Sequence, residues 1–123
     1  MENNYLYINS RDELLRIDIS QIVYFEANGN YTNIVLANKL KGVANMSLQQ
    51  AEKVLSAHVK EKANIFARIG KRFIVNLNYV FDINLAKQTL TLSNYHTFAF
   101  QLPISKEALR KLKELYVKQP ANP

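Results

Sequence analysis

The stretch Arg68-Ile69-Gly70-Lys71-Arg72-Phe73-Ile74-Val75-Asn76 places a glycine and two adjacent cations between two apolar segments. Short apolar segments are typical of buried strands, and a brief polar interruption is typical of the turn that joins them. The stretch therefore predicts a basic tip on a buried hairpin stem. Loops held on a rigid scaffold are where binding groups tend to lie, so this tip is a candidate site.

A second junction of the same kind lies upstream. The apolar segment 22–25 runs through a polar stretch into the apolar segment 34–36. Asn28 and Gly29 lie in the middle of the polar stretch, and both residue types tolerate a positive φ, so they predict a tight hairpin turn. The sequence thus offers two loops on strand stems.

Other short apolar runs extend this pattern along the chain. Strands are predicted at 5–8, 14–17, 22–25, 31–37, 79–83, 89–92 and 97–102. Ser47 and Gln50 have the spacing of a capping box, which predicts a helix over 47–55. A second helix is predicted over 105–116, with Leu109, Leu112, Leu115 and Tyr116 as its apolar stripe. The expected fold is mainly β, with about ten short strands and two short helices.

The chain has 123 residues, which suits one domain with a sizeable core. There is no internal repeat, low-complexity tract or linker, so we expect a single domain over 1–118 and a flexible tail over 119–123. No apolar run approaches the roughly 20 residues that cross a bilayer, and the N-terminus lacks a signal-peptide pattern. We expect a cytoplasmic protein without a membrane partner.

The residue types argue against an enzyme. Cysteine is absent, and the two histidines, His58 and His96, have neither metal-ligand nor nucleophile spacing. Glu26 is a lone carboxylate, and glycine-rich phosphate loops are missing. No catalytic residue, metal or cofactor is expected.

The net charge of +6 is unevenly distributed. Residues 1–35 carry two cations and five anions, whereas residues 36–123 carry 14 cations and five anions. A basic excess favours polyanions as partners through long-range attraction. Nucleic acid is therefore a candidate partner, although many basic proteins bind none.

Several ordered pieces of the sequence together resemble the LytTR family of bacterial DNA-binding domains. The pieces are 18–32, Met46-Ser47-Leu48 with Glu52, 66–77, and Leu102-Pro103-Ile104-Ser105-Lys106. The resemblance covers roughly residues 5–115. It implies packed antiparallel sheets with one or two short helices, and binding of duplex DNA by loops that enter successive major grooves. Most members carry the domain behind a receiver domain. This sequence shows no receiver domain, so we expect the chain to resemble a stand-alone transcription regulator.

The resemblance also implies a set of DNA-facing residues in three loops. They are Asn28, Asn30, Tyr31, Thr32 and Asn33 in the first loop, Lys71 and Arg72 in the second, and Lys106 and Arg110 at the start of the last helix. The usual family pattern in the second loop is His-Arg-Ser, whereas this chain has Gly70-Lys71-Arg72. A cationic contact therefore carries over, but the base preference does not.

For the second loop, Lys71 suits phosphate contact and Arg72 could chelate guanine, against the alternative of a solvated basic loop. Arg68 could contact DNA or act as a scaffold residue that pairs with Glu26. Lys106 is a phosphate candidate, and Arg110 either shares its surface or belongs to a solvated helix face.

For the first loop, Asn30 could bond an adenine edge or only hold the turn, and Tyr31 could pack at the strand start. Thr32 and Asn33 point to opposite faces of a strand, so only one of them can face a groove.

The leading hypothesis is sequence-specific binding of double-stranded DNA, with two copies on a repeated site and a separate sensor or receiver protein as a further partner. The competing hypothesis is a protein-interaction module that joins a signalling partner through an exposed β edge. RNA is a third reading, but the paired aromatic motifs of a stacking sheet are missing.

Overall fold

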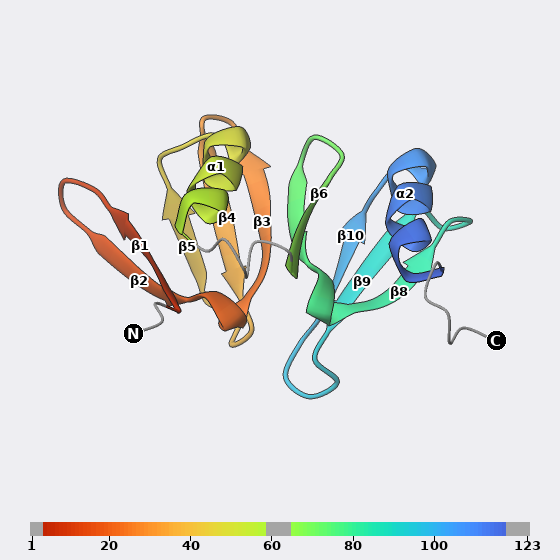
Figure 1. Ribbon diagram of the computed structural model, residues 1–123. Helices are drawn as coiled ribbons and strands as arrows, with labels where there is room; N and C mark the ends of the chain where they lie inside the picture. The colour runs from red at the N-terminus through yellow and green to blue at the C-terminus, as the bar shows by residue number, and fades with distance from the viewer. Residues whose placement is uncertain (1–3, 59–64, 118–123) are drawn as a thin grey trace. The chain divides into compact units, whose positions relative to one another are not determined.

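The computed structural model describes residues 4–58 and 65–117, and in these residues ten strands form three antiparallel sheets (Figure 1). Two α-helices accompany the strands. The prediction of a mainly β fold with about ten strands and two helices is confirmed. The backbone divides into two compact units, Met1–Asn78 and Tyr79–Pro123.

The first unit contains a five-stranded sheet and a two-stranded sheet. The five-stranded sheet has the order β5-β4-β3-β7-β6, and β1 pairs with β2 in the smaller sheet. The strands are β1 (Tyr5–Asn9), β2 (Leu14–Asp18), β3 (Ile22–Asn28), β4 (Tyr31–Leu36), β5 (Lys41–Ala44), β6 (Phe66–Ile69) and β7 (Phe73–Asn76). The helix α1 (Leu48–His58) packs against β3, β4 and β7.

Burial of apolar side chains from the helix and both sheets holds this unit together. Leu48, Ala51 and Leu55 of α1 are 3–4% exposed and belong to one core cluster with Phe25 and Ile74 of the sheet. Fully burying a leucine, isoleucine or phenylalanine side chain contributes about 1.5–3 kcal/mol. The packing fixes the sheet against α1, and thereby the ends of the strands from which the turns emerge.

The second unit consists of a three-stranded sheet and a helix. The sheet has the order β10-β9-β8, and its strands are β8 (Val80–Asn84), β9 (Thr89–Ser93) and β10 (Ala99–Pro103). The helix α2 (Lys106–Val117) follows β10, and its Leu109 and Leu112 are buried. Leu90 and Leu92 of β9 are fully buried as well, so this unit has apolar residues from both sheet and helix in its interior.

The predicted capping box of α1 is present. The backbone N–H of Gln50 donates to the Ser47 hydroxyl at 3.1 Å, and the backbone N–H of Ser47 donates to Oε1 of Gln50 at 2.8 Å. Two N–H groups that lack helical partners are thereby satisfied. The signal is local in sequence, which is why the start of α1 could be predicted.

Two sequence expectations need correction. The strand β5 was not predicted, because Lys41 and Val43 are exposed on it and Gly42 interrupts its apolar pattern. Leu115 is 53% exposed rather than part of the apolar stripe of α2, because that stripe is buried only as far as Leu112. The single domain over 1–118 stays a prediction, and the tail 119–123 lies outside the described residues.

Candidate nucleic-acid interface

The first candidate loop is the two-residue turn between β3 and β4. The strand residues that flank it are the paired Asn28 and Tyr31, so the turn itself is Gly29-Asn30. The predicted tight hairpin turn is therefore present, with positive φ at Gly29 (+61°) but not at Asn28 or Asn30. Glycine at the first central position is the pattern of a type II′ hairpin. Asn28, Asn30 and Tyr31 are all exposed there.

The second candidate loop, Gly70-Lys71-Arg72, joins β6 to β7 and lies beside the first. β7 pairs with β3 in antiparallel register, with Glu26 opposite Phe73, and the N–H of Ala27 donates to the carbonyl oxygen of Arg72 at 2.8 Å. Both turns therefore emerge at the same end of the five-stranded sheet (Figure 1). Two segments that are distant in sequence form one surface.

Arg72 is partly neutralised at this surface. Its Nη2 donates to Oε2 of Glu26 at 2.9 Å, and its guanidinium lies 5.2 Å from the centroid of the Phe73 ring. The Arg72 side chain is nevertheless 60% exposed. A cation with this exposure can exchange a carboxylate for a phosphate, at the expense of the ion pair with Glu26.

Glu26 also affects its neighbour Tyr24. Burial of the phenol raises the pKa of Tyr24, and the negative charge of Glu26 raises it further. Tyr24 is therefore a neutral residue beneath the turns, and its ring packs edge-on against Phe73 at 6.0 Å. It supports the base of the second loop.

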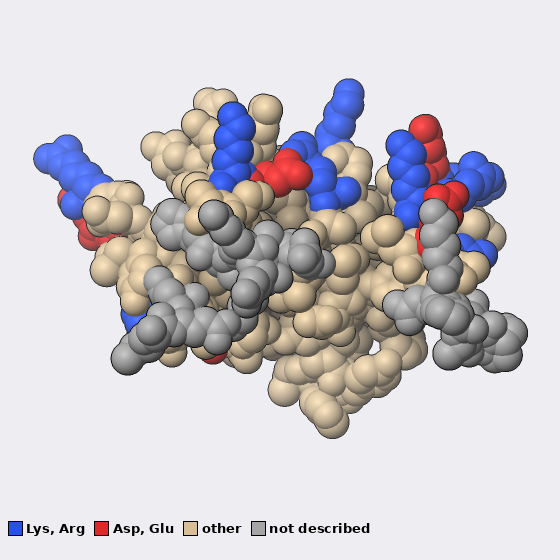
Figure 2. Space-filling model, viewed as in Figure 1, with Lys and Arg blue, Asp and Glu red and all other residues tan. Residues whose placement is uncertain are grey.

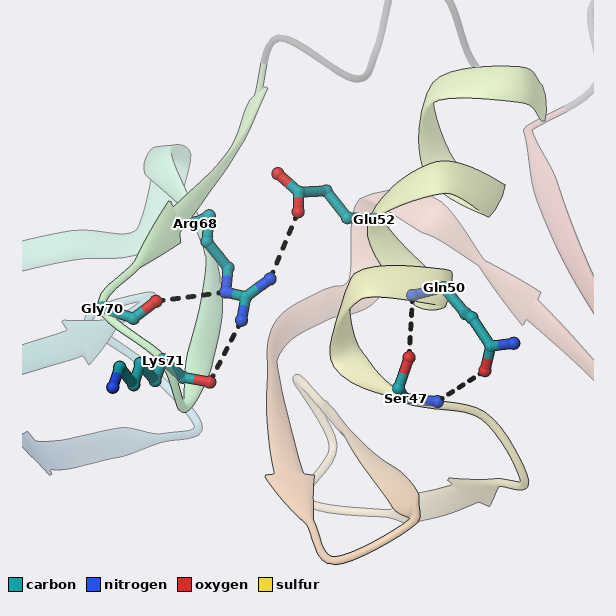
Figure 3. Close-up of polar contacts among 6 residues, drawn as sticks. All are labelled: Ser47, Gln50, Glu52, Arg68, Gly70 and Lys71. Carbon is teal, nitrogen blue, oxygen red and sulfur yellow. Dashed lines mark hydrogen bonds and ion pairs between the residues drawn. The ribbon is translucent and has the colours of Figure 1, made fainter.

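Arg68 does not pair with Glu26, as the sequence allowed, but with Glu52 of α1. The distance between Nη1 and Oε1 is 3.2 Å, and the remaining nitrogens of Arg68 bond the carbonyl oxygens of Gly70 and Lys71 (Figure 3). Sequence reasoning had no signal for the Glu52 contact, because the two residues are 16 positions apart and meet only through the packing of the helix against the sheet.

Lys71 differs from the two arginines beside it. It is exposed, and among the described residues it forms no ion pair. Figure 3 shows its side chain extending away from the Arg68 guanidinium. Figure 2 shows Lys and Arg side chains projecting from the turn end of β6 and from α1, with acidic side chains between them. Lys71 is thus the least compensated cation of this turn.

Thr32 and Asn33 are placed differently from the sequence expectation that one of them faces outward. Thr32 is 0% exposed, and its hydroxyl donates to the carbonyl oxygen of Met46 at 2.8 Å. Asn33 is 8% exposed. Both faces of β4 are covered at this point, so the expected alternation between a buried and an exposed face fails.

The third candidate loop is the start of α2 in the second unit. Ser105 caps the helix, since its hydroxyl accepts from the N–H of Ala108 at 3.3 Å. Lys106 and Arg110 are exposed. Further along the helix, Lys111 lies 4.0 Å from Glu107, and Figure 2 shows cations and anions mixed over α2. Positive charge on this helix is therefore partly compensated by neighbouring carboxylates.

Other kinds of site find no support in the part of the chain that the structure describes. No group of three or more His, Cys, Asp or Glu side chains is arranged to hold a metal ion there. His96 lies in an exposed turn after β9. Within residues 4–58 and 65–117, neither helix is long and apolar enough to cross a membrane.

Comparison with known proteins agrees with these features. Residues 12–116 match the family of the LytTr DNA-binding domain. Two heme-containing CO-sensing transcriptional regulators of Paraburkholderia xenovorans, RcoM 1 and RcoM 2, are each 27% identical over 105 residues. That match covers 85% of this chain but only 37% of either regulator.

The fold has a counterpart among solved structures. The LytTr DNA-binding domain of a Bacillus cereus protein described as a methyl-accepting/DNA response regulator superposes with a TM-score of 0.66 and 22% sequence identity. The superposition covers 93% of this chain and 97% of that domain. The chain therefore belongs to the LytTR family, whose domain binds DNA in the regulation of transcription.

Proposed function

We propose that this chain binds specific sequences of duplex DNA through its three loops, which enter successive major grooves. One observation carries the proposal. The backbone hydrogen bond between Ala27 and Arg72 ties the β3–β4 and β6–β7 turns together at one end of a rigid sheet. Exposed amide and cationic side chains on such a frame can read base edges and bind phosphates together.

In this proposal, Asn30 and Asn28 contact bases and Lys71 contacts phosphate. An asparagine amide can donate to and accept from an adenine edge at once, which a cation cannot do. Phosphate contacts make up the majority of protein–DNA hydrogen bonds, and the uncompensated charge of Lys71 suits one. Tyr31 is 48% exposed and can pack against the sugar–phosphate backbone beside them.

At the start of α2, we assign Lys106 and Arg110 to the phosphates. They lie one helical turn apart on the same side, so one stretch of backbone can meet both. The first-turn N–H groups of a helix also attract anions. These contacts position the protein without selecting a sequence.

We assign Thr32 and Asn33 a supporting role instead of a DNA contact. The bond from Thr32 to Met46 joins the strand after the first turn to the segment before α1. Arg72 is assigned a phosphate or guanine contact that forms only when Glu26 releases it. Glu26 therefore belongs to the interface, as the residue that sets how available Arg72 is.

The assembly around the domain is also a proposal. The curated relatives are regulators named for heme and CO sensing, and this chain spans about 37% of their length. We propose that two copies bind a repeated site and that signal input comes from a receiver or sensor outside the matched region. The names of the relatives assign no ligand to this chain.

Selection from a random DNA library with purified protein tests the proposal. We expect one enriched motif, and binding that weakens steeply with salt as phosphate contacts are lost. Lys71→Ala should weaken binding, whereas Lys41→Ala should not, because Lys41 lies opposite Val35 at the far end of β4. Absence of an enriched motif would overturn sequence-specific binding.

An exposed β edge supports the alternative function of a protein-interaction module. β5 is an edge strand of the five-stranded sheet, and Val43 on it is 49% exposed. A partner strand could add to this edge through backbone hydrogen bonds. Such a complex should respond little to salt, whereas DNA binding should respond strongly.

A further inference from the structure

Arg68 turns back onto the loop that follows it. Its Nε donates to the carbonyl oxygen of Gly70 at 3.1 Å, and its Nη2 donates to the carbonyl oxygen of Lys71 at 3.2 Å (Figure 3). Its Nη1 donates to Oε1 of Glu52 at 3.2 Å. Three of the five N–H donors of the guanidinium are therefore used within the protein.

These bonds reach a part of the loop that the sheet does not hold. The β6–β7 ladder ends at the pair Ile69 and Phe73, so the Gly70 and Lys71 carbonyls lie beyond it. A planar guanidinium can bond both carbonyls in a fixed geometry, which the single ammonium of lysine cannot reproduce. The side chain of Arg68 thus supplies the loop with a clamp.

Glu52 anchors this clamp to α1. The carboxylate orients the guanidinium and compensates its charge, and the side chain of Arg68 is only 30% exposed. The first turn of α1 is itself fixed by the capping box of Ser47 and Gln50 (Figure 3). The clamp therefore links the loop to a helix that is packed on the sheet.

We propose that Arg68 is a positioning residue that, with Glu52, pre-orders the β6–β7 loop and so presents Lys71 to DNA. The inference rests on the proposed function, and it assigns Arg68 no direct DNA contact. Its guanidinium is engaged with the loop backbone, while the Lys71 side chain extends the other way. Ordering a loop before binding removes an entropic cost from association.

A charge-preserving variant separates positioning from direct contact. Arg68→Lys keeps the positive charge but loses the planar set of N–H donors that bonds both loop carbonyls. It should weaken DNA binding about tenfold, the loss expected when a charged hydrogen bond is removed. Arg68→Gln should weaken binding by a similar factor. Retention of wild-type affinity by Arg68→Lys, with loss in Arg68→Gln, would mean that the charge itself meets a phosphate and would overturn the proposal.

Glu52→Gln should change DNA affinity in opposite directions under the two possible roles of Arg68. If Arg68 is a positioning residue, loss of its anchor weakens DNA binding. If Arg68 contacts phosphate, removal of the competing carboxylate strengthens binding. An increase in affinity would therefore contradict the clamp.

A double-mutant cycle tests whether Arg68 acts through Lys71. In a Lys71→Ala background, Arg68→Lys should have little further effect, because the contact that it positions is already gone. Full additivity of the two effects would overturn the proposal. Arg11→Lys, at the exposed β1–β2 turn, is the matched control and should leave affinity unchanged.

A measurement without DNA keeps the inference separate from the proposed function. Backbone ¹⁵N order parameters at Lys71 and Arg72 should fall in Arg68→Lys and in Glu52→Gln, but not in Arg11→Lys. Unchanged order parameters would overturn the clamp even if wild-type protein binds DNA well. If the order parameters fall but wild-type protein binds no DNA, the clamp holds and the proposed function fails, together with the role of Arg68 in presenting Lys71.

Discussion

Arg72 on the β6–β7 turn and Glu26 on β3 form an ion pair, with Nη2 and Oε2 at 2.9 Å. The two residues are 46 positions apart in the sequence. They meet because β3 and β7 are neighbours in the sheet. The cation that sequence reasoning singled out as a guanine reader is therefore partly compensated within the protein.

Glu26→Gln should strengthen DNA binding severalfold and reduce discrimination between sequences. The substitution frees Arg72 for phosphate, and each added phosphate contact steepens the slope of log affinity against log salt by about 0.9. The measurement is affinity for specific and random duplexes over a salt series. Stability should change by no more than about 1 kcal/mol, because the pair is partly exposed. Unchanged affinity and slope would show that Arg72 does not reach DNA.

Lys106→Ala should weaken binding to all sequences alike. A phosphate contact carries no base information, and its loss should lower the salt slope by about 1. Lys113→Ala, further along the same helix, is the charge-matched control. Fluorescence anisotropy with a specific and a scrambled duplex measures both. Loss confined to the specific duplex would instead assign Lys106 to base reading.

Thr32→Val should destabilise the fold by about 1–3 kcal/mol, because it leaves the Met46 carbonyl without the hydroxyl that it accepts from. Thr89→Val offers the contrast, because among the described residues its buried Oγ1 has no hydrogen-bond partner. That substitution should be neutral or stabilising. Denaturant unfolding of both variants is the measurement, and equal destabilisation would argue against the Thr32 bond.

Gly70→Ala should destabilise by about 1–2 kcal/mol, the cost of a β-carbon in the left-handed region. Gly70 has φ +65°, and no atom beyond its two chain neighbours lies within 4 Å of an added Cβ, so this cost comes from backbone strain. Gly70→Asn should recover most of the stability, because asparagine tolerates that region. A thermal melting series orders the three proteins, and an alanine variant as stable as wild type would contradict the assignment.

The features that sequence could predict are those determined by neighbouring residues. The capping box of Ser47 and Gln50 and the turn at Gly70 each involve residues only a few positions apart. Their residue types and spacing are therefore enough to predict them. The burial of Thr32 was not predictable in this way. It depends on a hydrogen bond to the Met46 carbonyl oxygen, 14 positions away, which forms only because the segment before α1 packs beside β4.

Charge compensation was the least predictable part of the site. Sequence reasoning assigned Lys71 to phosphate and Arg72 to a guanine without a partner for either cation, and the only carboxylate it offered Arg68 was Glu26. The actual partners, Glu26 for Arg72 and Glu52 for Arg68, follow from strand order and helix placement. Net charge therefore indicated the class of partner, but not which cation is available to it.

The hydrogen bond from Ala27 to Arg72 joins main-chain atoms only. The spacing between the two turns is consequently independent of the side chains displayed on them. Asn30 and Lys71 could be exchanged for other residue types while the distance between their backbones stays constant. Substitutions in the two turns can therefore change what the domain recognises, while the backbone that positions the turns stays the same.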